Sequence, residues 1–132
     1  MAIPRFTVFE QVGGEATFFR LADVFYELVD GDPDLRPMFP GDLAGPKERL
    51  ALFLSQYFGG PSTYSERRGH PRLKMRHVPF SIGTAERDRW VGHMLAAIDT
   101  IQVPEPACSQ MKEYFEHAAT FMINRVDAEV VP

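Results

Sequence analysis

Apolar residues recur along this chain at spacings of three and four, which is the period of an α-helix. The pattern predicts four substantial helices separated by glycine and proline, over residues 15–30, 45–58, 84–101 and about 107–122. The sequence has no convincing strand alternation and no repeats. We therefore expect an all-α fold. In the first predicted helix the apolar face consists of Phe18, Leu21, Ala22, Phe25 and Val29.

The length of 132 residues fits one domain, and a hydrophobic content of 45% with eleven phenylalanines is enough to build a real core. We expect a single domain over residues 1–132, with an ordered core at about 6–125 and a loose tail from Val126 to Pro132.

The net charge of −4 argues against a general nucleic-acid or anionic-membrane binder. The single cysteine, Cys108, excludes an internal disulfide and any multi-cysteine zinc or iron–sulfur site. No apolar run approaches the roughly 20 residues of a membrane span, and residues 1–9 lack the apolar core of a signal peptide. We therefore expect a soluble cytoplasmic protein.

Residues 61–82 form a predicted loop of about 20 residues between the second and third helices, and loops of this length are usually functional when they are ordered. Five basic residues follow one another in it with no acidic residue after Glu66. Two interpretations stay open, a solvated basic loop and a site for an anionic group. The basic residues are Arg67, Arg68, Arg72, Lys74 and Arg76.

His77 has the surroundings of a haem ligand, although an isolated histidine is more often a structural or surface residue. It follows a short helical-looking piece over 72–76 that Pro79 stops, and it is flanked by apolar residues that include Leu73 and Phe80. Haem needs an imidazole on iron, an apolar slot and cations for its propionates, and this segment contains all three. We assign no role to His70, His93, His117 or Cys108.

Several motifs together resemble the group II, or O-type, truncated haemoglobins over about residues 9–124. They are the segment GGPSTYSERRGHPRLKMRHVPF at 59–80, the Gly13-Gly14 pair, Phe25-Tyr26, LAGPKERL at 43–50, and Trp90 thirteen residues beyond His77. The resemblance implies a truncated globin fold, in which two helices pack over two around haem b. It also implies that the first helix is a stub and that the helix carrying His77 is about one turn long.

The same resemblance implies three central roles. His77 is expected to bind iron through Nε2, while its other ring nitrogen donates to a backbone carbonyl. Tyr26 and Trp90 are expected to donate hydrogen bonds to a gas ligand that gains partial negative charge on binding. From spacing alone, a core role is favoured for Tyr26. Trp90 can be a core residue on a helical stripe and point its N–H at the ligand at the same time.

Further haem contacts are implied around this centre. Phe39 is expected against the haem face, at a position where some members have a tyrosine. Arg49, Tyr64 and Arg76 are expected at the propionates or haem edge, with a solvated arginine as the alternative for Arg49 and Arg76. The apolar lining is expected to include Leu50, Phe53, Leu54, Leu73, Phe80 and Met94.

Pro46 aligns with the position where many globins have a distal histidine or glutamine. Proline offers no donor and little bulk, so the cavity edge there is expected to be open to small ligands. A slip of one residue in the short segment 41–45 would move this assignment and leave that of His77 unchanged.

The expected function is reversible binding of O2, and of CO and NO, with slow O2 release, so the protein is not primarily an enzyme. Two alternatives stay open: NO dioxygenase or peroxidase-like turnover with an external reductase, and a haem-based gas sensor. A helical nucleic-acid binder using residues 67–76 is disfavoured by the acidic charge and the lack of a helix-turn-helix pattern. Homo-oligomeric contacts, most simply a dimer, and weak membrane contacts are compatible with the sequence.

Overall fold

The structure is a computed structural model that describes residues 6–125. The loose tail predicted for 126–132 lies outside the described residues. The four predicted long helices are confirmed, and every boundary agrees to within one residue of its prediction. They are α2 (Glu15–Asp30), α3 (Ala44–Tyr57), α6 (Thr84–Thr100) and α7 (Ala107–Phe121).

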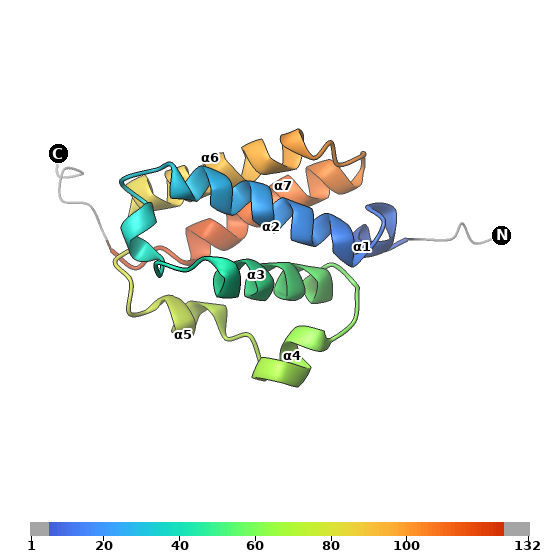
Figure 1. Cartoon of the computed structure of the whole chain (residues 1–132), viewed down its shortest axis with the longest axis horizontal. Coiled ribbons are helices and arrows are strands. Elements are labelled where there is room, and N and C mark those ends of the chain that lie inside the picture. The colour runs from blue at the N-terminus through green and yellow to red at the C-terminus, as the bar shows by residue number, and fades with distance from the viewer. Residues whose placement is uncertain (1–5, 126–132) are drawn as a thin grey trace.

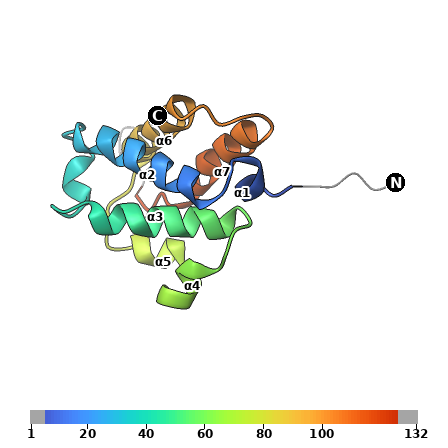
Figure 2. The ribbon, with the colours of Figure 1, turned by 45° about the vertical axis from the view of Figure 1, so that its right-hand side comes forward.

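These helices form two antiparallel pairs. The colour gradient shows α3 running back along α2, and α7 running back along α6 (Figure 1). Helix α2 packs on both α3 and α6, so it joins the two pairs (Figure 2). This arrangement confirms the all-α, two-over-two sandwich. No helix among residues 6–125 is long and apolar enough to cross a membrane.

The core lies where α2 meets the other long helices. Phe18, Leu21, Ala22, Phe25 and Val29 are all fully buried, as the apolar face of α2 predicts. Burial of one such large side chain contributes about 1.5–3 kcal/mol, so this face is enough to fix α2 in the fold. The partners from α6 and α7 are Met94, Ile98, Met111 and Phe115.

A short helix, α1 (Val8–Gln11), precedes α2 and closes one end of the sandwich. Its first turn is a capping box, in which Glu10 N donates to Thr7 Oγ1 and Thr7 N donates to Glu10 Oε1. Added β-carbons at Gly59 and Gly60 would lie 2.5 Å from Thr7 and from the Phe9 ring. The glycine pair after α3 therefore makes room for this stub.

The segment 61–82 is not one loop, and that prediction is wrong in part. It contains the short helix α4 (Thr63–Arg68) as well as α5 (Leu73–His77), the helical piece that was predicted. Helix α4 has only Tyr64 as a buried residue, so it has no apolar period to detect. A short 3-10 helix, η1 (Arg36–Met38), links α2 to α3.

Long-range hydrogen bonds hold this segment in place. Gln56 of α3 bonds the backbone N–H and the hydroxyl of Ser65. Lys74 donates to the carbonyls of Phe121 and Ile123 at the C-terminal end of α7, where a cation is favourable. Asn124 donates to the carbonyl of Phe80 at 2.8 Å. Helix α5 is thus tied to α7.

Candidate haem site

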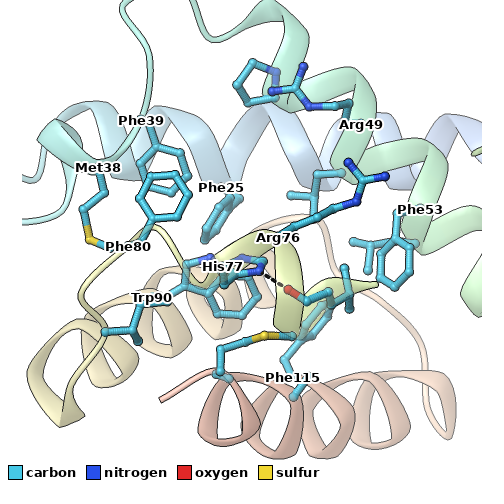
Figure 3. A pocket seen from close by; sticks show the side chains of 18 of the residues that line it. Phe25, Met38, Phe39, Arg49, Phe53, Arg76, His77, Phe80, Trp90 and Phe115 are labelled. Atoms are coloured by element: carbon cyan, nitrogen blue, oxygen red, sulfur yellow. Dashed lines mark hydrogen bonds between the residues drawn. The ribbon is translucent and has the colours of Figure 1, made fainter. Parts of the chain in front are cut away.

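A cavity of about 530 Å³ lies between the two helix pairs and α5 (Figure 3). Its volume is in the range typical of ligand sites, and its walls are largely apolar and aromatic. It brings together thirteen of the fourteen residues assigned to the site from the sequence. They are Tyr26, Phe39, Pro46, Arg49, Leu50, Phe53, Leu54, Tyr64, Leu73, Arg76, His77, Phe80 and Trp90.

His77 is the last residue of α5, and its half-buried ring borders the cavity. Its Nδ1 lies 2.6 Å from the carbonyl oxygen of Leu73, one turn earlier (Figure 3). A carbonyl can only accept, so Nδ1 carries the proton and donates. Nε2 is then the nitrogen with the free lone pair, and within residues 6–125 it has no hydrogen-bond partner.

Two donors border the same cavity from the opposite helices. The Tyr26 side chain of α2 is buried, with 6% exposed, and its ring packs edge-on against Phe25 and Phe39. Burial raises the pKa of the Tyr26 phenol to about 12, so the hydroxyl keeps its proton at neutral pH. Trp90 of α6 packs against Phe25 at 5.2 Å.

Neither the Tyr26 hydroxyl nor the Trp90 indole N–H makes a hydrogen bond to a described residue. Both residues line the cavity, so an occupant that supplies an acceptor would satisfy these two donors. The distal half of the cavity therefore suits a small ligand with a partial negative charge.

Arginines supply positive charge around the cavity. Arg49, Arg68 and Arg76 all line it, and none of them forms an ion pair with a carboxylate in the described part of the chain. Arg76 is oriented by a bond from its Nε to the Pro71 carbonyl at 2.6 Å. Arg49 comes from α3 and Arg76 from α5 (Figure 3).

The basic segment therefore divides by role. Arg68 and Arg76 lie at the cavity, whereas Arg67 pairs with Glu48 at 3.2 Å on the surface and Lys74 caps α7. An anionic edge of a cavity occupant would meet two of the five cations. The local concentration of positive charge is thus only partly explained by this site.

Met94 is the one assigned site residue that the structure places elsewhere. It is fully buried in the core cluster and is not among the residues that line the cavity. It lies one turn beyond Trp90, where α6 packs against α2 and α7, so neighbouring helices cover it. The assignment of Met94 as a haem contact therefore stays a prediction that the lining of the cavity does not support.

Several wall residues were not assigned to the site from the sequence. Phe25 lies on the predicted apolar face of the first long helix and also borders the cavity, as do Phe115 and Met122 at α7. One helix face can pack on another helix at one end and line a cavity at the other end. Both parts belong to the same apolar stripe, so the sequence does not separate core residues from cavity residues. The others include Leu35, Met38, Ile82, Arg87 and Ala118.

The residues present fit a haem. The cavity offers an imidazole nitrogen with a free lone pair, apolar walls, unpaired cations and two donors without partners. Among residues 6–125, no three His, Cys, Asp or Glu side chains gather in a way that could hold a metal ion. An iron held by His77 would take its other protein-independent ligands from the porphyrin of a haem. Fold and site together define a globin-type haem protein.

Comparison with known proteins agrees with this class. A family model described as "Bacterial-like globin" matches residues 7–124. The chain is 38% identical over 116 residues to the Group 2 truncated hemoglobin YjbI of Bacillus subtilis, covering 88% of each chain.

Solved structures are similar as well. A hemoglobin from Chloroflexus aurantiacus is 62% identical with a TM-score of 0.90, covering 92% of this chain and 100% of that one. A truncated oxygen-avid haemoglobin from Bacillus subtilis is 36% identical with a TM-score of 0.86, covering 90% and 100%. The chain belongs to the group II truncated haemoglobins, a family whose members bind haem and small gas ligands such as O2.

Proposed function

We propose that this protein binds haem b through Nε2 of His77 and captures O2 reversibly, with slow release. The observation that carries the proposal is the hydrogen bond from His77 Nδ1 to the Leu73 carbonyl. That bond fixes the tautomer and the ring orientation, and it makes Nε2 the more basic ligand. Arg49, Arg68 and Arg76 would hold the propionates, and Phe39, Leu50 and Phe80 would pack on the ring.

When bound, the haem supplies an iron that coordinates diatomic gases. The chain supplies the groups that select and retain them. Tyr26 and Trp90 donate to the ligand from the distal side, and a hydrogen bond to a charged group contributes about 1.5–3 kcal/mol. Each donor therefore slows ligand escape by roughly tenfold or more.

Two features of this chain limit the distal network. Phe39 has no hydroxyl, so Tyr26 and Trp90 carry the polar contacts. Pro46 is buried in the first turn of α3 and lines the cavity without offering a side-chain donor. We propose that small gases pass this edge without displacing a hydrogen-bonded side chain.

Titration of the purified chain with hemin tests the proposal. We expect one haem per chain, a sharp Soret band and a shifted band on reduction and CO addition. Stopped-flow displacement of O2 by CO would then give the slow off-rate. A chain that binds no hemin would contradict haem binding, and a fast O2 off-rate would contradict the role of the distal donors.

Redox turnover, as NO dioxygenation or peroxidase-like activity, is the second candidate. A continuous series of aromatic rings from the cavity to the surface favours it, as argued below. Sustained turnover needs electrons from an external reductase, which we propose as the partner. The single cysteine fits a reducing cytoplasm. We also propose a homodimer, for which exposed Val78 offers apolar surface outside the hollow beside Tyr57, and size-exclusion chromatography would test it.

A further inference from the structure

Four aromatic rings form an unbroken series from the cavity to the surface. Trp90 lies 5.8 Å from Phe115, Phe115 lies 5.3 Å from Tyr114, and Tyr114 lies 4.1 Å from Tyr57, measured between ring centroids. Trp90, Phe115 and Tyr114 line the cavity. Tyr57, at the end of α3, is 53% exposed.

Tyr114 is a shared wall between the cavity and a second, open hollow on the surface. That hollow, of about 930 Å³, lies between α5 and α7 and is also lined by Tyr57, Met75, His117 and Phe121. The Tyr114 ring therefore faces the proposed haem on one side and the Tyr57 ring on the other. A group bound in the cavity and a molecule in the hollow would be separated by the Tyr114 side chain.

Tyrosine and tryptophan are among the side chains that lose an electron most readily, and short ring-to-ring steps favour electron tunnelling. An oxidised phenol also loses its proton, so the surroundings of each hydroxyl matter. Burial raises the pKa of the Tyr114 phenol to about 12, and its hydroxyl has no hydrogen-bond partner in the described part of the chain. Tyr57 is open to water, which accepts a proton. We therefore expect the tyrosyl radical to localise on Tyr57.

The other tyrosines cannot take this role. Tyr26 and Tyr64 are buried, with 6% and 5% exposed, so neither can meet a molecule from solution. Tyr114 is only partly exposed and lies behind Tyr57. Tyr57 is the one tyrosine of the chain that combines exposure with contact to the cavity wall.

We propose that Tyr57 is a surface site of one-electron oxidation, connected to the cavity through Tyr114 and Phe115, at which phenolic reductants too large for the cavity are oxidised. The inference rests on the proposed function, because the haem must occupy the cavity. The oxidant is hydrogen peroxide, which takes up two electrons and two protons and gives two water molecules.

Each electron comes from Tyr57, whose phenolic proton goes to solvent, and each resulting tyrosyl radical regains a hydrogen atom from a phenol. Overall, two phenols and one peroxide give two phenoxyl radicals and two waters. Without a phenol, Tyr57 radicals of two protein molecules couple through a carbon–carbon bond to dityrosine, and the two ring protons shift to restore the phenols.

The test is treatment of the haem-loaded chain with hydrogen peroxide in the absence of reductant. We expect a covalent dimer with dityrosine fluorescence, and peptide mapping should place the cross-link at Tyr57. Tyr57→Phe should lose the dityrosine and keep the Soret absorbance per chain. Tyr114→Phe, which keeps the ring and removes the oxidisable hydroxyl, should reduce the yield.

Met75→Leu is the matched control, since it removes another oxidisable exposed side chain from the same hollow, and it should leave the yield unchanged. Haem-free chain with peroxide should give no cross-link. Undiminished dityrosine in Tyr57→Phe, a cross-link at another tyrosine, or none in a haem-loaded wild type would overturn the inference. A chain that takes up no haem would instead contradict the proposed function, and this inference with it.

Discussion

The Nδ1 atom of His77 lies 2.6 Å from the carbonyl oxygen of Leu73, one turn earlier in the same five-residue helix. The bond selects the tautomer in which Nε2 can bind a metal. Helix α5 is itself held by Lys74 and by Asn124. The orientation of the His77 imidazole thus depends on its own helix and on contacts of that helix with the C-terminal end of α7.

Replacement of His77 by glycine should abolish stable haem binding, because no other described side chain at the cavity is an imidazole. We expect the variant to purify largely without haem, as measured by the ratio of Soret to protein absorbance. Added free imidazole should restore binding by filling the space left by the side chain. Normal haem content without imidazole would remove His77 from the site.

Replacement of Trp90 by phenylalanine should speed O2 dissociation by about tenfold or more, because one charge-assisted hydrogen bond is lost. The aromatic ring is kept, so the packing against Phe25 and Phe115 is largely preserved. Stopped-flow displacement by CO measures the rate. An unchanged off-rate would mean that the indole N–H does not reach the ligand.

Replacement of Tyr26 by phenylalanine should also speed O2 dissociation, and the double variant should be non-additive because both donors serve one ligand. The phenol stays neutral at neutral pH because burial raises its pKa to about 12. The effect of Tyr26→Phe should therefore be independent of pH between about 6 and 9. Additive effects of the two substitutions would contradict a shared acceptor.

Asp32→Asn should lower the melting temperature at neutral pH. Asp32 is buried just after the end of α2. Its carboxylate accepts a hydrogen bond from His93 Nε2 at 2.7 Å and forms an ion pair with Arg89 of α6. The His93 hydrogen bond is the main reason that the pKa of the Asp32 carboxyl falls from 3.8 to about 2. The folded state thus favours the ionised carboxylate.

The pH dependence follows from that direction. Stabilisation by Asp32 is fully present above pH 3.8 and is lost as the pH falls towards 2, so the two melting temperatures should converge there. Asp34→Asn is the control, since it breaks an exposed ion pair with Arg89 and should change stability little. A constant difference between wild type and Asp32→Asn across this range would contradict the account.

Helical period was enough to predict the four long helices, because each buries a stripe of large apolar residues such as Phe18 and Phe25. It could not predict α4, whose single buried residue leaves no pattern. The helix predicted over 45–58 ends just before the Gly59-Gly60 pair. The two glycines are also needed because Thr7 and Phe9 approach them closely. The sequence could not predict this need, because the contact joins residues about 50 apart in the chain.

The site residues likewise divide into those that the sequence could predict and those that depend on tertiary contacts. Most of the assigned site residues lie in family motifs, and the cavity brings these together. Met94 does not line the cavity, because a helical stripe does not reveal where helix packing ends and a cavity begins. The link between Asp32 and His93 joins residues 61 apart and left no local signal. The ring contact of Tyr57 with Tyr114 is likewise a tertiary relationship.

The resonance Raman spectrum of the reduced, ligand-free protein tests the central claim most directly, since it detects the bond between iron and a histidine nitrogen. We predict a low-frequency iron–histidine stretching band in the wild type. It should be absent from His77→Gly and return at a shifted frequency with added imidazole. The same band, unshifted, in His77→Gly without imidazole would show that another group holds the iron.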